Sequence, residues 1–186
     1  MRIDVIFMSY KKYLLDYSVE EYVDDKGRTK KRAVYIAGSY ILSPAIPMGE
    51  KYLMLAATII SWLSLIGAFF PRTHASELAY VILPFVFTLL PLYYMTGAIV
   101  TLLLESEQLT RERADKIVKR LPPCSLISAV LLAAAFIGLA ITAIISRDGM
   151  LAGDILFGAL SLVASVAEAF IYIKCRGLKA YKAEDS

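Results

Sequence analysis

Residues Leu121–Ser146 read LPPCSLISAVLLAAAFIGLAITAIIS, a run of 26 residues without a charged side chain. A helix needs about 20 apolar residues to cross the hydrocarbon core of a bilayer, and helices in soluble cores rarely stay uncharged for so long. Three similar blocks surround this one. Tyr52–Pro71 and Leu78–Leu104 carry no charge, and Gly149–Ile173 carries two acids. The sequence therefore predicts an integral membrane protein.

The composition of the whole chain agrees with that class. Of the 186 residues, 58% are hydrophobic, and the mean hydropathy is +0.61. Soluble domains contain about 45–50% apolar residues even with glycine included, and disordered chains contain fewer still. The net charge is only +3, so we expect no binding of nucleic acid.

We expect an all-α membrane protein with four transmembrane helices, because lipid offers no partner for an unpaired backbone amide. The predicted spans are residues 52–70, 79–104, 126–145 and 150–173. Together they form a transmembrane domain over residues 52–173. An N-terminal segment, residues 1–51, precedes this domain, and a tail, residues 174–186, follows it.

The distribution of Lys and Arg predicts how the helices are oriented. Residues 1–51 contain nine of them, residues 105–125 contain five and residues 174–186 contain four. The remaining connections contain only Arg72 and Arg147. Cytoplasmic loops carry the excess of basic residues in membrane proteins. We therefore expect a multi-pass protein of the cell membrane with both termini in the cytoplasm.

The N-terminal segment is predicted to contain a helix followed by a β-hairpin. Met1–Tyr17 has apolar residues at the spacing of an amphipathic helix. This helix either lies among the lipid headgroups or packs on the rest of the segment, and a strand over Ile3–Phe7 is an alternative. A hairpin over residues 18–43 is predicted because a glycine-containing loop, Asp24–Arg28, separates two β-rich runs.

Opposite charges on the two arms support this hairpin, since each cross-strand pair contributes about 0.2–1 kcal/mol. The acids lie on the first arm, and the second arm carries the bases Arg28, Lys30, Lys31 and Arg32. These bases are candidate contacts for anionic lipid headgroups or for a partner protein, although the facing acids weaken the attraction to lipid. A lone two-stranded hairpin is marginal in water. It should therefore rest on the membrane surface, the N-terminal helix or a partner.

The loop between the second and third spans is predicted to contain a cytoplasmic helix over residues 110–120. Thr110 can cap its start, and Pro122 and Pro123 should end it. This helix is either a solvated connector or a docking element for a cytoplasmic partner.

Two of the predicted spans contain residues that affect helix geometry or packing. In the second span, Pro84, Thr88 and Pro91 form a candidate kink, because each proline frees a carbonyl that a nearby hydroxyl can satisfy. In the third span, Ala134, Gly138 and Thr142 have the small-xxx-small spacing. That spacing lets backbones approach closely, either within the chain or between protomers.

A polar stripe follows one face of the fourth span. Its members are Asp154, Ser161, Ser165 and Glu168. Their spacing has the heptad period that keeps side chains on one face of a helix. Ionisable groups inside a membrane are functional candidates. The stripe is therefore either a proton or cation relay, or its acids lie near the two interfaces and only orient the helix.

The sequence favours a function without catalysis. It has one His and two Cys, and it contains no H-E-x-x-H, G-x-S-x-G or Walker A motif. We expect no cofactor and no metal site. The leading interpretation is an accessory, assembly or sensing subunit that binds a cytoplasmic or membrane protein partner, or forms a homo-oligomer. The alternative is a small oligomeric transporter or channel that uses the polar face of the fourth helix.

The predicted orientation can be tested by labelling with a membrane-impermeant maleimide. A cysteine placed at Thr73 or Gly149 should react from outside sealed cells, because both positions lie in loops that the positive-inside rule assigns to the outer side. Native Cys124 and Cys175 should not react. Labelling of Cys124 from outside would reverse the orientation.

Overall fold

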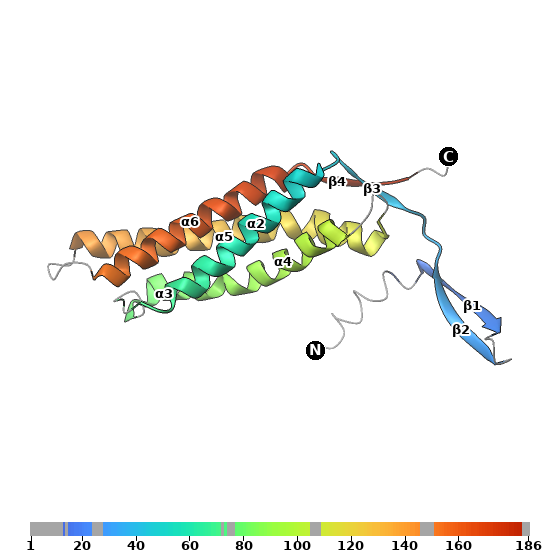
Figure 1. The fold of residues 1–186 in the computed structure, drawn as a ribbon, viewed down its shortest axis with the longest axis horizontal. Helices are drawn as coiled ribbons and strands as arrows, with labels where there is room; N and C mark the ends of the chain where they lie inside the picture. The colour runs from blue at the N-terminus through green and yellow to red at the C-terminus, as the bar shows by residue number, and fades with distance from the viewer. Residues whose placement is uncertain are drawn as a thin grey trace.

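The computed structural model describes residue 13 and residues 15–23, 28–71, 73, 77–104, 109–145 and 151–183. Most of this part of the chain is helical, and its helices form an elongated bundle (Figure 1). The helices are α2 (Met48–Ala68), α3 (Ala79–Phe87), α4 (Leu89–Leu104), α5 (Arg111–Ile145) and α6 (Ala152–Cys175).

Four helical segments are long and apolar enough to cross a membrane, as the sequence predicts. They are α2, the pair α3–α4, α5 and α6. Their outward faces are apolar, and Leu63, Phe70, Leu90 and Ile144 are among the exposed side chains. A multi-pass membrane protein follows from these lengths and surfaces. The direction in which the bundle crosses the membrane stays a prediction.

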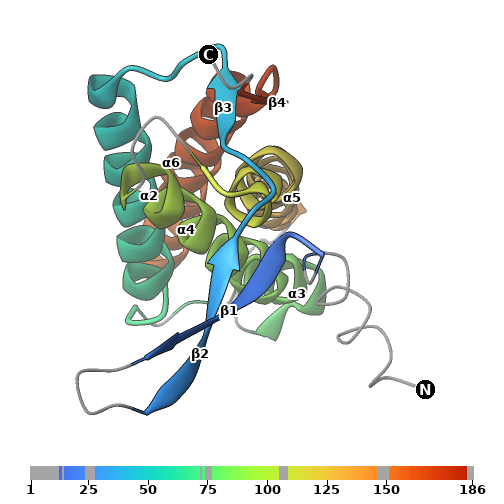
Figure 2. The same cartoon turned by 90° about the vertical axis from the view of Figure 1, so that its right-hand side faces the viewer.

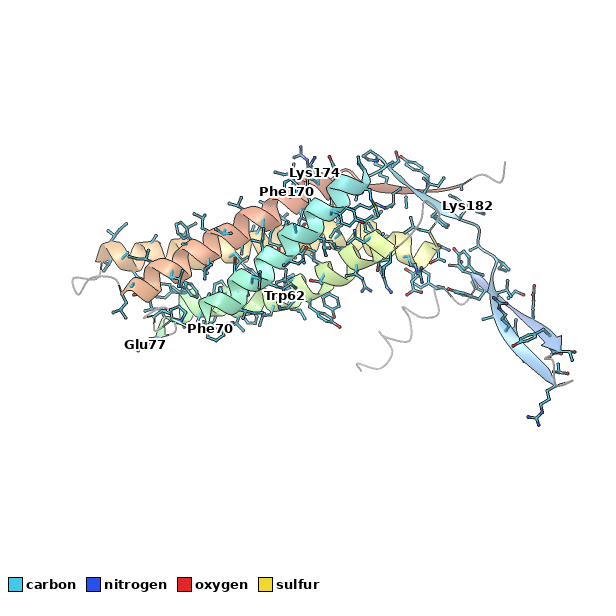
Figure 3. The ribbon with its side chains drawn as sticks, viewed as in Figure 1. Trp62, Phe70, Glu77, Phe170, Lys174 and Lys182 are labelled. Atoms are coloured by element: carbon cyan, nitrogen blue, oxygen red, sulfur yellow. The ribbon has the colours of Figure 1, made fainter. Side chains whose placement is uncertain are left out.

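Helix α6 packs between α5 and α2, and α5 also packs against α3 and α4. Small residues allow these close approaches. A side chain at Gly158 of α6 would meet Leu139 of α5 at 3.2 Å, and one at Gly67 of α2 would meet Leu160 of α6 at 3.3 Å. Trp62 of α2, labelled in Figure 3, donates a hydrogen bond of 3.0 Å from its Nε1 to Thr96 Oγ1 of α4.

Helix α5 corrects one prediction, because it runs from Arg111 to Ile145 without a break. Residues 110–120 do not form a separate helix that ends at Pro122 and Pro123. The Ser125 hydroxyl donates to the carbonyls of Leu121 and Pro122, at 3.0 Å each, one turn after the prolines. Long apolar packing beyond this point keeps the chain helical where local propensity alone would end the helix.

The candidate kink in the second span is a break between α3 and α4 at Thr88. Thr88 is fully buried, and its hydroxyl donates to the Pro84 carbonyl at 3.0 Å. That carbonyl also accepts the Thr88 amide, at 3.2 Å. The hydroxyl therefore closes the last turn of α3, and it does not satisfy a carbonyl that a proline has freed.

Two small antiparallel sheets lie at one end of the bundle, the end where α2 and α5 begin and α4 and α6 end. We call it the basic end, because Lys51, Arg111 and Lys174 lie there. Strand β1 (Tyr17–Val23) pairs with β2 (Thr29–Tyr35), and β3 (Tyr40–Ser43) pairs with β4 (Lys179–Lys182). Tyr40 also exchanges backbone hydrogen bonds of 2.8 and 2.9 Å with Leu109.

These sheets correct the predicted hairpin, which ends at Tyr35 rather than at Ser43. Gly38 lies between the two sheets with φ +80°, a conformation that favours glycine. The chain turns there, and β3 leaves the hairpin to pair with β4 from the predicted tail. The sequence could not reveal this pairing, because residues 40 and 182 are brought together only by the bundle.

The predicted N-terminal helix over Met1–Tyr17 falls mainly on residues outside the described ranges. Its last residue is not helical, since Tyr17 is the first residue of β1. The turn of the hairpin, residues 24–27, also lies outside the described part. Among the thiols, Cys175 is buried and lies 3.9 Å from Met54 Sδ, whereas Cys124 is partly exposed. Cys124 is therefore the informative native thiol for topology labelling.

The fold makes a prediction about Gly138, which is buried where α5 crosses α3. An added Cβ would lie 3.2 Å from both Tyr80 Cδ2 and Val81 Cγ2. Gly138→Leu should therefore destabilise the bundle by about 1–3 kcal/mol, measured as unfolding in mixed detergent micelles. Gly97→Leu is the matched control, because no atom lies within 4 Å of a Cβ at that exposed helical glycine. Equal losses in the two variants would contradict this packing.

Candidate functional site

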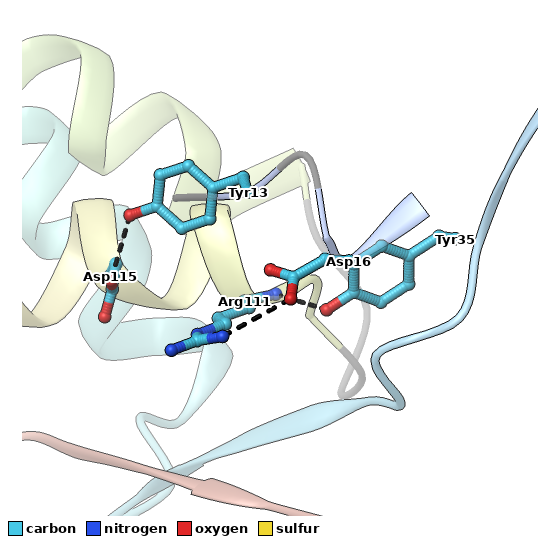
Figure 4. Close-up of polar contacts among 5 residues, drawn as sticks. All are labelled: Tyr13, Asp16, Tyr35, Arg111 and Asp115. Carbon is cyan, nitrogen blue, oxygen red and sulfur yellow. Dashed lines mark hydrogen bonds and ion pairs between the residues drawn. The ribbon is translucent and has the colours of Figure 1, made fainter. Parts of the chain in front are cut away.

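The base of the hairpin β1–β2 is attached to the first turns of α5 by polar contacts (Figure 4). They come from residues just before β1 and from the last residue of β2. Asp16, just before β1, forms an ion pair with Arg111 at 3.3 Å. Tyr35, the last residue of β2, accepts a hydrogen bond of 2.8 Å from the Arg111 amide. Tyr13 donates a hydrogen bond of 2.9 Å to Asp115. We call these five residues the hairpin anchor.

The hairpin anchor is shielded from solvent at its centre. The Asp16 residue is 5% exposed, and the Tyr35 ring lies edge-on to Tyr17 with centroids 5.3 Å apart. Burial raises the pKa of the Tyr35 hydroxyl, although its hydrogen bond from Arg111 opposes the rise and the charge of Asp16 adds to it. Tyr35 therefore stays neutral and holds the Arg111 amide. The sequence analysis missed this site, because about 95 residues separate its partners along the chain.

The two arms of the hairpin bring opposite charges together, as the sequence predicts. Glu20 lies opposite Arg32 and Glu21 opposite Lys31, and the Lys31–Glu21 ion pair measures 3.2 Å between side chains that are largely exposed. Arg28 is exposed as well, whereas the Lys30 side chain is outside the described part. Lys31 and Arg32 therefore face acids across the sheet, whereas Lys30 lies opposite Tyr22.

One face of the hairpin is mostly apolar and open. Alternate residues of β1 share a face, and Tyr17, Val19 and Val23 are 39%, 65% and 68% exposed. The Glu21–Lys31 pair lies between the two valines on the same face. We call Tyr17, Val19, Val23 and the residues opposite them the open face of the hairpin.

The polar stripe of α6 lies on one buried or partly buried helix face, but its members have different surroundings. Asp154 accepts a hydrogen bond of 3.0 Å from the Leu151 amide and so caps the start of its own helix. Ser165 donates to the Ala129 carbonyl of α5 at 2.9 Å. Ser161 and Glu168 are buried, and their side-chain oxygens have no hydrogen-bond partner. Asp154 thus has a structural role, and Glu168 stands apart from it.

Comparison of the chain with protein-family models, with curated proteins and with solved structures finds no significant match in any of the three. Within the described ranges, no three side chains of His, Cys, Asp or Glu come together in a group that could hold a metal ion. Function must therefore be argued from the hairpin, its anchor and the interior of the bundle.

The hairpin anchor can be tested by limited proteolysis. Arg111→Ala removes the partner of Asp16, so the hairpin should detach from α5 and be cleaved faster between Val23 and Arg28, with the helices intact. Lys116→Ala is the matched control, because it breaks the exposed ion pair with Glu112 on the same helix. Cleavage at the same rate in wild type and Arg111→Ala would show that the anchor does not hold the hairpin.

Proposed function

We propose that this chain is a non-enzymatic accessory, assembly or sensing subunit of the membrane, and that its hairpin binds a cytoplasmic protein. The observation that carries the proposal is the position of the hairpin. It extends beyond the basic end of the bundle in Figure 1 and past the outline of the helices in Figure 2. The positive-inside rule assigns this end to the cytoplasm.

The structure of the hairpin supports a binding role. Both strands of a two-stranded sheet are edge strands, whose free backbone groups can pair with another chain. The open face also leaves Val19 and Val23 in contact with solvent. Such a sheet is marginal in water by itself, and the anchor fixes only its base. A partner that covers the open face would supply the missing burial.

A protein partner fits better than a lipid surface. Arg32 and Lys31 of β2 lie opposite Glu20 and Glu21 of β1, and Lys30 lies opposite Tyr22. The paired strands therefore present only a small net positive charge to anionic headgroups. In Figure 1 the hairpin lies beyond the helix ends, where a cytoplasmic protein can reach it. The open face is apolar at its two ends and charged at its middle, a combination that suits an extended protein segment.

Photo-crosslinking in native membranes tests the proposal. A benzoylphenylalanine at Val23, on the open face, should crosslink to a defined protein. The same probe at Tyr22, its neighbour on the opposite face, should crosslink at least about tenfold less. Val19→Lys should abolish the crosslink from Val23 because a buried, unpaired charge is costly in an interface, whereas Ser18→Lys should not. Equal crosslinking from both faces, or none, would contradict a partner on the open face.

A second candidate function, a small oligomeric transporter or channel, is favoured by a separate observation, the unpartnered Glu168 within the bundle. Ionisable side chains within membranes often mark ion pathways. Reconstituted vesicles with an ion-sensitive dye test it. Protein-dependent flux that disappears in Glu168→Gln, with the fold intact, would favour transport over the subunit role.

A further inference from the structure

Glu168 lies in the interior of the bundle, in the last third of α6. It is seven residues before the end of α6 at Cys175 and sixteen after its start at Ala152. At 1.5 Å per residue, these separations correspond to about 10 Å and about 24 Å. The residue has no exposed surface. The carboxyl is therefore buried between the helices, about two turns from the end of α6.

Hydroxyl groups from two other helices lie at the level of Glu168. Ser61 of α2 is close enough to act on the carboxyl, although the geometry does not form a hydrogen bond to it. The hydrogen bond from Ser165 of α6 to the Ala129 carbonyl of α5 shows which residues of these two antiparallel helices lie side by side. One turn from that contact toward the basic end, Glu168 lies at the level of Ser125 and Ser128, both fully buried.

Two of these hydroxyls donate to backbone carbonyls, whereas the Ser128 hydroxyl has no partner among the described residues. Ser61 donates its proton to the Ala57 carbonyl at 3.1 Å, and Ser125 donates its proton to the Leu121 and Pro122 carbonyls. Each oxygen keeps lone pairs that no described donor uses. An ionised carboxylate is also an acceptor only. The region around Glu168 is therefore rich in oxygen lone pairs, and both carboxylate oxygens remain unpaired.

No basic side chain among the described residues compensates the charge of Glu168. The basic residues of the helices packed on α6 all lie toward the basic end. On α2, the charged residues there are Glu50 and Lys51. Lys174 is six residues beyond Glu168 and bonds Glu50 at 2.7 Å. On α5, the nearest base is Arg120, which is exposed and lies over the Tyr94 ring at 5.8 Å. The other acid of α6, Asp154, is at the opposite end of the helix.

We propose that Glu168 anchors a binding site for a small monovalent cation, with sodium as the probe. The carboxylate supplies the single negative charge, and the hydroxyls of Ser61, Ser125 and Ser128 supply neutral oxygen ligands. Hard cations prefer oxygen ligands, and one carboxylate balances one positive charge. A divalent ion would leave excess charge in an apolar layer, which is costly. The proposal concerns binding alone, so it holds whether or not the ion crosses the membrane.

Thermal unfolding of the purified protein in detergent tests the site. A ligand bound only by the folded state raises the unfolding midpoint. At a sodium concentration about 100 times the Kd, the midpoint should rise by roughly 5–10 °C over choline chloride of equal ionic strength. The same midpoints measured in lithium and potassium chloride show which size of ion the site prefers. Equilibrium binding of radioactive sodium should approach one ion per chain.

Matched variants assign the effect to Glu168. Glu168→Gln should remove the sodium-dependent shift, whereas Glu50→Gln, which alters an acid paired at the basic end, should keep it. If Glu168→Gln does not fold, Ser128→Ala serves instead. It should keep the fold and move the sodium dependence to at least about tenfold higher concentration. Equal midpoints in all salts, together with no bound sodium, would overturn the proposal and indicate a carboxyl that carries its own proton.

Discussion

The packing of α6 between α5 and α2 is the interaction on which the rest of the structure depends. Gly158 and Gly67 bring the helix surfaces close together, and Ser165 ties α6 to the α5 backbone. This packing sets the level at which Glu168 meets the serines of α2 and α5. It also brings the end of α6 to the basic end, where β4 emerges beside β3. The interior site and the outer sheets thus share one helix as their support.

The polar groups of the protein are divided between two environments. At the basic end, the hairpin anchor joins Asp16, Arg111 and Tyr35 through an ion pair and a hydrogen bond. In the bundle interior, the Glu168 carboxylate has no hydrogen-bond partner among the described residues, and the lipid on the outer faces offers none. The first environment suits reversible contact with a partner protein. The second suits a ligand that is small, positively charged and held by oxygen atoms.

The sequence predicted four apolar helices well, because the length of an uncharged run is a direct physical requirement of the bilayer. It also predicted a hairpin with opposite charges on its two arms, and Glu20 and Glu21 do face Arg32 and Lys31. It failed where distant segments meet. The β3–β4 sheet and the Asp16–Arg111 pair depend on contacts that no local pattern contains. The polar stripe was read as one unit, and only the surroundings of each side chain separated the cap, Asp154, from the buried carboxyl, Glu168.

The short sheet of β3 and β4 has a mechanical consequence. The hairpin is joined to the bundle by three routes: covalently through β3 to α2, by backbone pairing through β4 to α6, and by the anchor to α5. A load applied to the hairpin is therefore divided among three helices instead of passing down one chain. One of these helices, α6, also carries Glu168, so a load on the hairpin reaches the helix that holds the buried carboxyl.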